Sequence, residues 1–358
     1  MRIVQLNPFH YPFMGGIEHR IHHISSILAK EHEVIVLTGQ LPGTAEEEEM
    51  GGYRVLRLPS KLYTNYNPPH IVTKGLLAKL NDLEPDVVDF HYRWSGSYRK
   101  AMKRYMGKRV FTFHNTFGEG EGLIGMFSTL NDIAHTGFIN SFDRVVCVSE
   151  FVRSDLEKRG FSPDLLEAVP NGVDPPSQLD GQEGDFILFL GRLVRTKGLD
   201  YLLKAMESVS VPLVIAGGGP EDKHLRKMVQ SNGLEDRVKI LGRVSEEEKH
   251  RLLSECRLFV FPSVWESYGI AAAEAMSYGK AVITTDVGGL PEVVGDAGVL
   301  VPSREPKALS IAINGLISDD NRRRELGLRA RERVRSYTWK RAAEEMERIY
   351  NDVVSDRS

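Results

Sequence analysis

The feature that most constrains the fold is a regular alternation of strand-like runs and helical stretches. Alternation of this kind predicts an α/β protein with mostly parallel sheets and helices on both faces. The first series of strand-like runs comprises Arg2–Leu6, Glu33–Thr38, Tyr53–Leu58, Asp86–His91, Arg109–His114 and Asp143–Val148. The helical stretches between them comprise Gly16–Glu31, Ile71–Leu83, Ser95–Tyr105 and Gly125–Asn140. The second series comprises Phe186–Leu190, Leu213–Ala216, Val238–Leu241, Leu258–Phe261, Ala281–Thr284 and Val299–Val301.

The two series predict two domains. The stretch 171–184 between them is rich in Pro, Gly and polar residues, as linkers are. We expect a first domain at 1–170, a linker at 171–184 and a second domain at 185–337, both domains Rossmann-like and doubly wound. A last helix is predicted near 338–358, because apolar residues recur there at helical spacing.

Composition excludes several classes of protein. The chain has 358 residues, of which 41% are hydrophobic and 27% charged, as in ordinary globular proteins. A net charge of −3 argues against a dedicated nucleic-acid binder. No apolar run is long enough to span a bilayer, and the N-terminus enters a strand too soon for a signal peptide. We expect Cys147 and Cys256 to be reduced core residues of a cytoplasmic protein.

The stretch from Phe261 to Met276 carries the most chemistry. An apolar strand ends there, and a helix of Ala, Ile and Met follows a short turn. The amides from Ser267 to Ile270 would lie at the amino end of this helix, where anions bind. The carboxylates of Glu266 and Glu274 would be roughly 10 Å apart along the axis. Two acceptors flanking a row of donors suit a nucleotide sugar, although a buried turn with two unrelated carboxylates fits the same residues.

Glu-Ser-Tyr-Gly-Ile followed by Ala-Glu-Ala-Met closely resembles the paired-glutamate motif of the retaining glycosyltransferases of family 4. This resemblance implies the GT-B architecture, in which two Rossmann-like domains face a central cleft and a C-terminal helix crosses back to the first domain. It also implies roles in donor binding: Glu266 would hold sugar hydroxyls and Glu274 the ribose. The residues between them that would line the donor are Ser267, Tyr268, Gly269 and Ile270.

The stretch Gly191 to Gly198 follows the first strand of the second domain, at the carboxyl end where open α/β sheets bind ligands. Arg192 can bind two phosphate oxygens at once, and Lys197 can supply a point charge. Solvated bases on a surface turn are the alternative. The pattern resembles the family's diphosphate-binding bases, which implies that Arg192 and Lys197 stabilise the leaving diphosphate. Because the chain contains no Asp-x-Asp, we expect no metal and no cofactor.

Glycine turns follow three other strands. Gly217 and Gly218 end one strand of the second domain without forming a Gly-x-Gly-x-x-Gly dinucleotide fingerprint. The resemblance implies that they lie near the nucleotide, as does Val244. In the first domain, Gly15 and Gly16 precede a helix whose amino end would approach the donor. A plain glycine turn explains the last pair equally simply.

His114 ends a first-domain strand, and the resemblance implies a catalytic histidine beside the sugar; a structural histidine is the alternative. His19, His22 and His23 have helical spacing that permits metal binding, but no third ligand is evident. We interpret the acidic run Glu46–Glu49 as a solvated loop.

The sequence therefore predicts a retaining, metal-independent glycosyltransferase that moves a sugar from a nucleotide-diphosphate sugar to a hydroxyl of a lipid, glycan or small molecule. A related sugar phosphorylase and a non-catalytic sugar-nucleotide-binding protein stay open as alternatives. The basic stretch from Arg93 to Arg109 lacks acidic residues, and Tyr98, Ala101, Met102, Tyr105 and Met106 recur within it at helical spacing. An ordinary βα helix explains this pattern, and so does peripheral contact with an anionic membrane at the inner face of the cell membrane.

Overall fold

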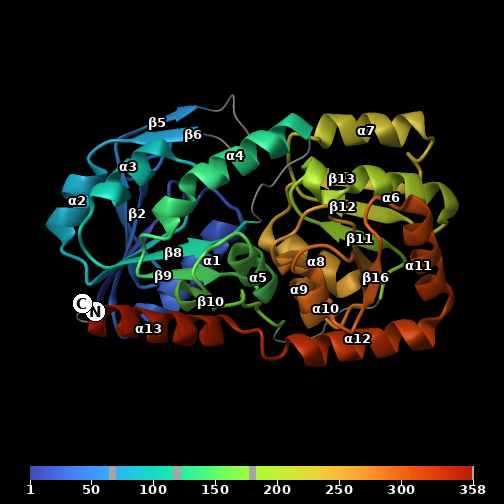
Figure 1. Cartoon of the computed structure of the whole chain (residues 1–358). Coiled ribbons are helices and arrows are strands. Elements are labelled where there is room, and N and C mark those ends of the chain that lie inside the picture. The colour runs from blue at the N-terminus through green and yellow to red at the C-terminus, as the bar shows by residue number, and fades with distance from the viewer. Residues whose placement is uncertain (64–69, 116–121, 177–182, 357–358) are drawn as a thin grey trace. The chain divides into compact units, whose positions relative to one another are not determined.

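The computed structural model divides the chain into two compact units, each built around one large sheet (Figure 1). It describes residues 1–63, 70–115, 122–176 and 183–356. Unit 1 comprises Met1–Gly172 together with Trp339–Ser358, and unit 2 comprises Val173–Thr338. Residues 177–182 of the predicted linker lie outside the described residues.

Unit 1 contains an eight-stranded sheet with the order β10-β9-β8-β7-β1-β2-β4-β3. Every neighbouring pair is parallel except β3 and β4, and a separate antiparallel hairpin joins β5 to β6. The strands are β1 (Arg2–Leu6), β2 (Glu33–Gly39), β3 (Glu47–Met50), β4 (Tyr53–Leu58), β5 (Ser60–Tyr63), β6 (His70–Thr73), β7 (Val87–Phe90), β8 (Arg109–Phe113), β9 (Arg144–Cys147) and β10 (Leu166–Ala168).

The prediction that Glu46–Glu49 is a loop is wrong, because β3 pairs with β4 there, although Glu46, Glu47 and Glu49 are exposed as expected. Arg54 Nη2 lies 2.8 Å from Glu47 Oε1, and Arg57 forms an ion pair with Glu48. These arginines neutralise carboxylates that would otherwise repel one another along the strand. An acidic edge strand is also poorly suited to pairing with another chain, so its charge protects the sheet.

The helices of unit 1 are α1 (Gly16–Leu28), α2 (Leu76–Leu83), α3 (Gly96–Arg104), α4 (Gly122–Ile139), α5 (Glu150–Lys158) and α13 (Trp339–Ser355). The last of these returns from unit 2 and packs against α1 (Figure 1). Trp339, Ala343, Met346 and Tyr350 are buried among side chains of β1, β2 and α1. Their spacing of three and four residues gives α13 one apolar face, which completes the core of unit 1.

The predicted apolar face of the basic stretch points inward. Tyr98, Ala101, Met102 and Tyr105 are all buried, as expected for an ordinary βα helix. Arg93 is also buried and forms two hydrogen bonds of 2.7 and 2.9 Å with Asp132. The expectation that Arg93 belongs to an exposed basic surface is therefore wrong.

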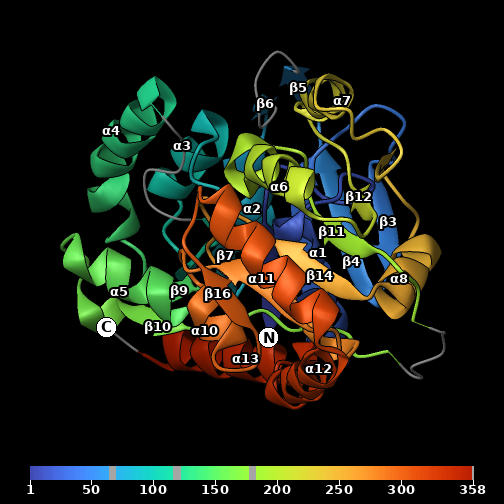
Figure 2. The ribbon, with the colours of Figure 1, turned by 90° about the vertical axis from the view of Figure 1, so that its right-hand side faces the viewer.

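Unit 2 contains a six-stranded parallel sheet with the order β13-β12-β11-β14-β15-β16. Helix α6 packs against α7 and α11 (Figure 2). Helix α12 packs against α9, α10 and α11. The strands are β11 (Ile187–Leu190), β12 (Leu213–Ala216), β13 (Val238–Gly242), β14 (Leu258–Phe261), β15 (Val282–Thr285) and β16 (Val299–Val301). The helices are α6 (Leu199–Ala205), α7 (Asp222–Ser231), α8 (Glu246–Glu255), α9 (Ile270–Ser277), α10 (Leu290–Val294), α11 (Pro306–Ser318) and α12 (Asp320–Val334).

The strand order of unit 2 reverses at β11. The chain runs from β11 outward through β12 to β13, and then returns to β14 on the other side of β11. At such a reversal the loops after neighbouring strands diverge, which is where open α/β sheets bind ligands. The loops after β11 and β14 therefore define the place to search for a site in this unit.

Within the described residues, none of the helices combines the length and the apolar character that crossing a membrane would need. Cys147 and Cys256 are free and buried, as expected of core residues. Burial raises the pKa of each thiol to about 12, so both stay protonated at neutral pH.

Candidate active site

The loops after β11, β12 and β13 touch one another at the carboxyl edge of the unit 2 sheet. Gly217 has φ +141°, and a Cβ at this position would lie 1.8 Å from the Gly191 carbonyl oxygen. A Cβ on Gly218 would lie 2.8 Å from Cγ of Arg243, in the loop after β13. Only glycines permit such close approach. The predicted nucleotide residues Gly217, Gly218 and the half-buried Val244 thus come from adjoining loops.

The loop after β14 packs equally closely on the loop after β11. Thr196 accepts hydrogen bonds from the amides of Val264 and Trp265, at 2.7 and 3.2 Å. Gly198 has φ +66°, and a Cβ there would lie 2.0 Å from the Pro262 carbonyl oxygen. These contacts hold the two loops as one rigid surface.

That surface carries an ion pair between two predicted catalytic residues. Lys197 Nζ lies 2.5 Å from Glu266 Oε2, and their side chains are 19% and 11% exposed. The same ammonium lies 5.0 Å from the centre of the Phe261 ring. Arg192 is exposed on the same loop as Lys197. Positive charge beside a carboxylate, at an open sheet edge, can bind phosphate oxygens while the carboxylate accepts hydroxyl protons.

The residues after Glu266 lead into α9. Tyr268 is buried, and Gly269 caps the helix with φ +104°. Ser267 and Tyr268 pass close to the backbone of Gly289, where a Cβ would lie 2.4 Å from the Ser267 carbonyl oxygen. Ile270 begins α9, and the first N–H groups of a helix point toward its amino end. The predicted anion-binding helix end therefore lies where the sequence placed it.

Glu274 pairs with a residue that the sequence did not single out. Its Oε1 lies 3.2 Å from Nζ of Lys249 on α8, and Lys249 also lies 2.7 Å from Glu246 Oε2. Burial disfavours the ammonium, but the charges and hydrogen bonds of Glu274 and Glu246 raise the pKa of Lys249 above its usual value. Burial also raises the pKa of Glu274, and Lys249 opposes that shift. Lys249 therefore stays charged beside Glu274 at neutral pH.

Lys249 is not part of a recognisable motif, because it lies in the polar first turn of an ordinary helix. Ser245 caps α8 by accepting a hydrogen bond from the amide of Glu248. Leu252 and Leu253 form the buried face of α8, and Lys249 contacts Glu274 of α9. Only tertiary packing reveals the contact with Glu274.

In unit 1, Gly15 caps α1 in an extended conformation, directly after the loop that follows β1. A Cβ on Gly15 would lie 2.6 Å from Glu18 Oε2, and Glu18 is buried with Oε1 3.0 Å from Asn7 Nδ2. The amino end of α1, where Gly16 begins the helix, therefore already has a carboxylate beside it. The histidines of α1 pack on aromatic rings: His23 stacks on Trp339, and His22 bonds the Tyr53 hydroxyl at 2.8 Å.

His114 follows β8 and meets His91, which follows the neighbouring strand β7. His114 Nε2 lies 2.9 Å from His91 Nδ1. Burial, together with His91 and nearby arginines, lowers the pKa of His114 well below its usual value. Its imidazole is therefore neutral at physiological pH and can act as a hydrogen-bond partner for a sugar.

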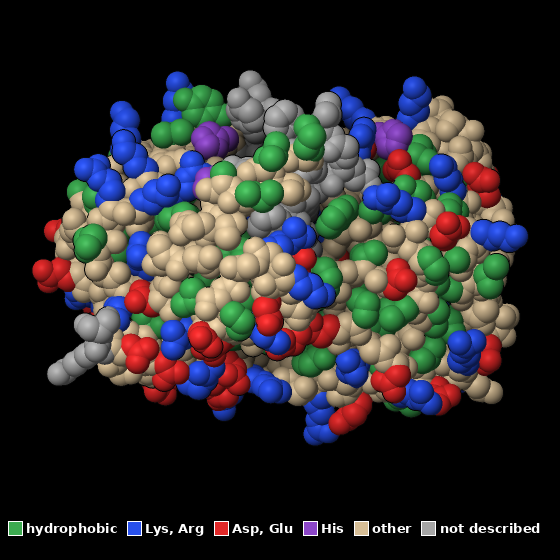
Figure 3. Space-filling model, viewed as in Figure 1, with side chains coloured by type: hydrophobic (Ala, Val, Ile, Leu, Met, Phe, Trp, Pro, Cys, Tyr) green, Lys and Arg blue, Asp and Glu red, His purple; other side chains and the backbone are tan. Residues whose placement is uncertain are grey.

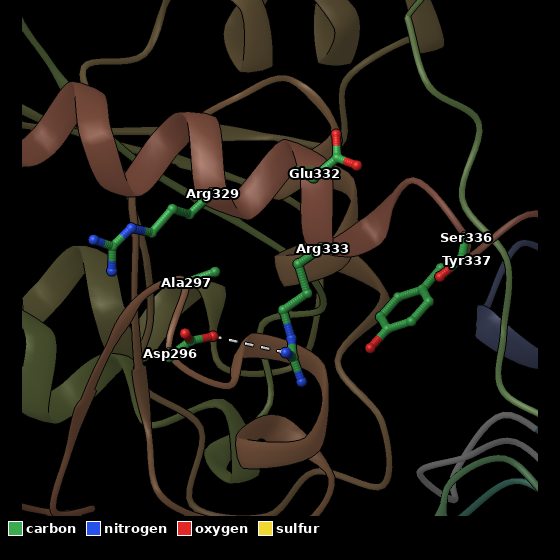
Figure 4. A pocket seen from close by; sticks show the side chains of 7 residues that line it. All are labelled: Asp296, Ala297, Arg329, Glu332, Arg333, Ser336 and Tyr337. Atoms are coloured by element: carbon green, nitrogen blue, oxygen red, sulfur yellow. Dashed lines mark ion pairs between the residues drawn. The ribbon is translucent and has the colours of Figure 1, made fainter.

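A separate open pocket lies at the end of α12 (Figure 4). Arg333 lies 3.8 Å from Asp296 there and also donates to the carbonyl oxygens of Glu292 and Val293. The lining contains none of the predicted donor residues: it consists of Asp296, Ala297, Arg329, Glu332, Arg333, Ser336 and Tyr337. Because Arg333 already bonds the protein, this pocket does not define the site.

Solved structures identify the fold of this chain. Sucrose-phosphate synthase from Thermosynechococcus elongatus matches with a TM-score of 0.83 at 22% identity, over 98% of each chain. Anabaena HepE in complex with UDP and glucose matches with a TM-score of 0.80 at 20% identity, over 98% of this chain and 99% of that chain. These likenesses establish the fold alone. It is the GT-B architecture of two Rossmann-like domains, and that prediction is confirmed.

Two family models match the chain, Glycosyltransferase Family 4 at residues 14–176 and Glycosyl transferases group 1 at residues 174–333. One subunit of the phosphatidylinositol N-acetylglucosaminyltransferase of Arabidopsis thaliana is 30% identical over 338 residues, covering 89% of this chain and 74% of that protein. Phosphatidyl-myo-inositol mannosyltransferase of Mycolicibacterium smegmatis is 29% identical over 376 residues, covering 99% and 94%. The chain belongs to the group 1 glycosyltransferases of family 4, as its sequence predicted.

Proposed function

We propose that the protein is a retaining, metal-independent glycosyltransferase that takes its sugar from a nucleotide-diphosphate sugar. The observation that carries this proposal is the ion pair of Lys197 with Glu266 on the joined loops after β11 and β14. A donor diphosphate competes with Glu266 for Lys197, and the freed carboxylate then accepts hydrogen bonds from sugar hydroxyls. Solved complexes of Anabaena HepE with UDP and with UDP-glucose support this class of donor.

In this proposal the donor extends across the carboxyl ends of the strands of the unit 2 sheet. Arg192 and Lys197 bind the diphosphate, and preorganised positive charge stabilises it as it leaves. Glu274, held by Lys249, accepts hydrogen bonds from the ribose. The turns at Gly217, Gly218 and Val244 lie against the base. His114 of unit 1 contacts a sugar hydroxyl.

The acceptor hydroxyl attacks on the face that the nucleotide leaves. The bond between the anomeric carbon and the donor phosphate oxygen breaks as the bond to the acceptor oxygen forms. The same phosphate oxygen takes the acceptor proton, so the sugar keeps its anomeric configuration. The cationic side chains of Arg192 and Lys197 supply the positive charge that a metal ion would otherwise supply.

We propose a lipid-linked hydroxyl as the acceptor, because the names of two relatives refer to phosphatidylinositol. Unit 1 offers a matching surface. Lys100, Lys103 and Arg104 are exposed on α3, and Met106 just beyond it is 92% exposed. On α4, Met126, Leu130 and Ile133 are 50%, 56% and 58% exposed at helical spacing. We call these seven residues the basic-apolar patch.

The two helices of the basic-apolar patch contact each other. Arg99 of α3 bonds His135 of α4, and Lys103 Nζ lies 5.6 Å from the Phe138 ring centre. Figure 3 shows hydrophobic side chains over α4 and Lys and Arg side chains toward α3. Bases beside exposed apolar side chains fit an anionic bilayer, at about 1 kcal/mol for each base. The enzyme would thus bind peripherally at the inner face of the cell membrane.

Thermal-shift screening against nucleoside diphosphates and nucleotide sugars in EDTA tests the donor. A ligand at 100 times its Kd adds about 2.7 kcal/mol of stability. Transfer is then measured with the donor found and phosphatidylinositol, and the anomeric configuration of the product is determined by NMR. Dependence on free phosphate would indicate the phosphorylase. Donor binding without turnover on any hydroxyl acceptor would indicate a sensor.

Co-sedimentation with vesicles tests the basic-apolar patch separately. Changing Leu130 and Ile133 to Ser, or the bases Lys100, Lys103 and Arg104 to Ser, should reduce binding to anionic vesicles. The matched control changes Ile311 and Leu328, which are 64% and 71% exposed in unit 2, to Ser. Equal binding of all variants, or equal binding to neutral vesicles, would contradict membrane contact.

A further inference from the structure

A chain of hydrogen bonds runs through the buried interior of unit 1 and ends at His114. It starts at the carboxylate of Asp89, which is completely buried in β7. Tyr350 of α13 donates to Asp89 Oδ2 at 2.6 Å, and Gln5 Nε2 donates to the Tyr350 hydroxyl at 3.0 Å. Gln5 Oε1 lies 2.6 Å from His91 Nε2, and His91 Nδ1 lies 2.9 Å from His114 Nε2.

The direction of each bond follows from the carboxylate. The oxygens of the Asp89 carboxylate accept from Tyr350, and Thr112 also donates to them at 2.8 Å. The Tyr350 hydroxyl therefore donates a hydrogen bond to Asp89, and the oxygen of that hydroxyl accepts one from the Gln5 amide nitrogen. The amide of Gln5 consequently turns its oxygen toward His91.

The same reasoning fixes both histidines. Because the oxygen of Gln5 can only accept, His91 must carry its proton on Nε2. A neutral His91 then has a bare Nδ1, so His114 must donate from Nε2. Burial lowers the pKa of His91 to about 4 and that of His114 well below its usual value, so neither ring carries a second proton at neutral pH.

We propose that Asp89 sets the tautomer of His114, with Tyr350, Gln5 and His91 as positioning residues between them. The Nδ1 atom of His114 then carries no proton. It can accept a hydrogen bond from a hydroxyl of the donor sugar, but it cannot donate one. The helix α13 takes part through Tyr350, 261 positions from Asp89. The role of this acceptor in sugar binding rests on the proposed function, whereas the tautomer itself does not.

We call the chain of hydrogen bonds from Asp89 to His114 the relay. The direction of every hydrogen bond in the relay depends on the carboxylate of Asp89, so a substitution at Asp89 tests it. Asp89→Asn can accept from Thr112 with its oxygen and donate from its amide to Tyr350. Every following bond then reverses: Tyr350 donates to a flipped Gln5, Gln5 donates to His91, and His114 carries its proton on Nδ1. Tyr350→Phe removes the hydrogen-bonded path and leaves the 3.6 Å contact between Asp89 Oδ2 and His91 Nε2. Tyr98→Phe is the matched control, because Tyr98 is an equally buried tyrosine of unit 1 whose hydroxyl bonds Thr73.

We would record histidine nitrogen–proton correlation spectra of the full chain labelled with ¹⁵N-histidine, assigning His114 by its loss in His114→Asn. The expected result is the Nε2–H tautomer in wild type and Tyr98→Phe, the Nδ1–H tautomer in Asp89→Asn and a mixture in Tyr350→Phe. An Nδ1–H wild type, or an unchanged His114 signal in folded Asp89→Asn and Tyr350→Phe, would overturn the relay.

Steady-state kinetics with the donor and acceptor found by screening separate the relay from the proposed function. Asp89→Asn and Tyr350→Phe should lower kcat about tenfold or more, with KM for the donor changed less and Tyr98→Phe close to wild type. The expected tautomers in a protein without transferase activity would refute the proposed function and leave the relay standing. Full kcat in a variant whose tautomer has reversed would overturn the catalytic part of the inference.

Discussion

The two units use polar side chains in opposite ways at the ends of their parallel strands. Unit 2 pairs opposite charges, Lys197 with Glu266 and Lys249 with Glu274, on side chains that remain partly exposed. At the histidine pair of unit 1, by contrast, the rings are uncharged, and His114 and His91 join a buried chain of hydrogen bonds. Charges near water can exchange partners with an anionic ligand at modest cost, whereas buried neutral bonds fix orientation. The difference fits the proposal that unit 2 binds the charged part of the donor and that His114 of unit 1 orients a sugar hydroxyl.

The largest effect is expected from Glu266→Gln, which removes the acceptor carboxylate and leaves Lys197 without its counter-charge. We expect kcat to fall about 10³-fold, in line with the loss of one preorganised catalytic group. Glu325→Gln, an exposed glutamate of α12 paired with Arg329, is the control. Turnover of Glu266→Gln within threefold of wild type would break the assignment of unit 2 as the donor site.

Removing the positive charge of Arg192 or of Lys197, in the loop after β11, should cost about 2–4 kcal/mol of transition-state stabilisation. The measurement is kcat/KM for the donor in Arg192→Ala and in Lys197→Ala. Lys204→Ala, which removes an exposed lysine of α6, serves as the comparison. A near-normal rate in Lys197→Ala would show that this ion pair is only structural.

Unit 1 should make the fold sensitive to acid. Burial lowers the pKa of His10 to about 3 and that of His91 to about 4, so the unfolded chain binds more protons below about pH 6.5. Stability is therefore fully present above that pH and is lost as the pH falls toward the folded pKa values. Each histidine should cost about 2 to 3 kcal/mol between pH 7 and pH 4.5. Urea unfolding at these pH values measures the loss, and a flatter profile in His91→Gln would confirm its source. An equal pH dependence in both proteins would count against a buried neutral His91.

A smaller effect is expected at the ribose position. Glu274→Gln keeps the shape but loses one charged acceptor, worth about 1.5–3 kcal/mol at most when fully used. We expect nucleoside diphosphate affinity to fall about tenfold by titration calorimetry. Glu246→Gln removes the other partner of Lys249 and should leave the affinity within about twofold. Unchanged affinity in Glu274→Gln would show that the ribose binds elsewhere.

The alternation of strands and helices predicted the fold class because each parallel strand needs a crossover of its own. Predictions from local sequence patterns failed for side chains whose ion-pair partners lie on another element. The acidic run Glu46–Glu49 was predicted as a loop because its arginine partners lie on the next strand. Arg93 was predicted to be exposed because its partner Asp132 follows 39 positions later.

The motifs after β11 and β14 pointed to Lys197 and Glu266, but not to their mutual ion pair. Lys249 and the relay from Asp89 to His114 went unnoticed, because they depend on residues up to 345 positions apart that meet only after packing. Spacing along a chain shows which residues share an element. It does not show which elements will touch.

The most direct test is titration of nucleoside diphosphates into the protein in EDTA and then in magnesium or manganese. If Arg192 and Lys197 supply the charge that binds the diphosphate, affinity in EDTA should equal that with metal within about twofold. Lys197→Ala should bind weakly under both conditions. Loss of binding in EDTA, restored by either metal, would contradict the central claim that protein cations replace a metal ion in this site.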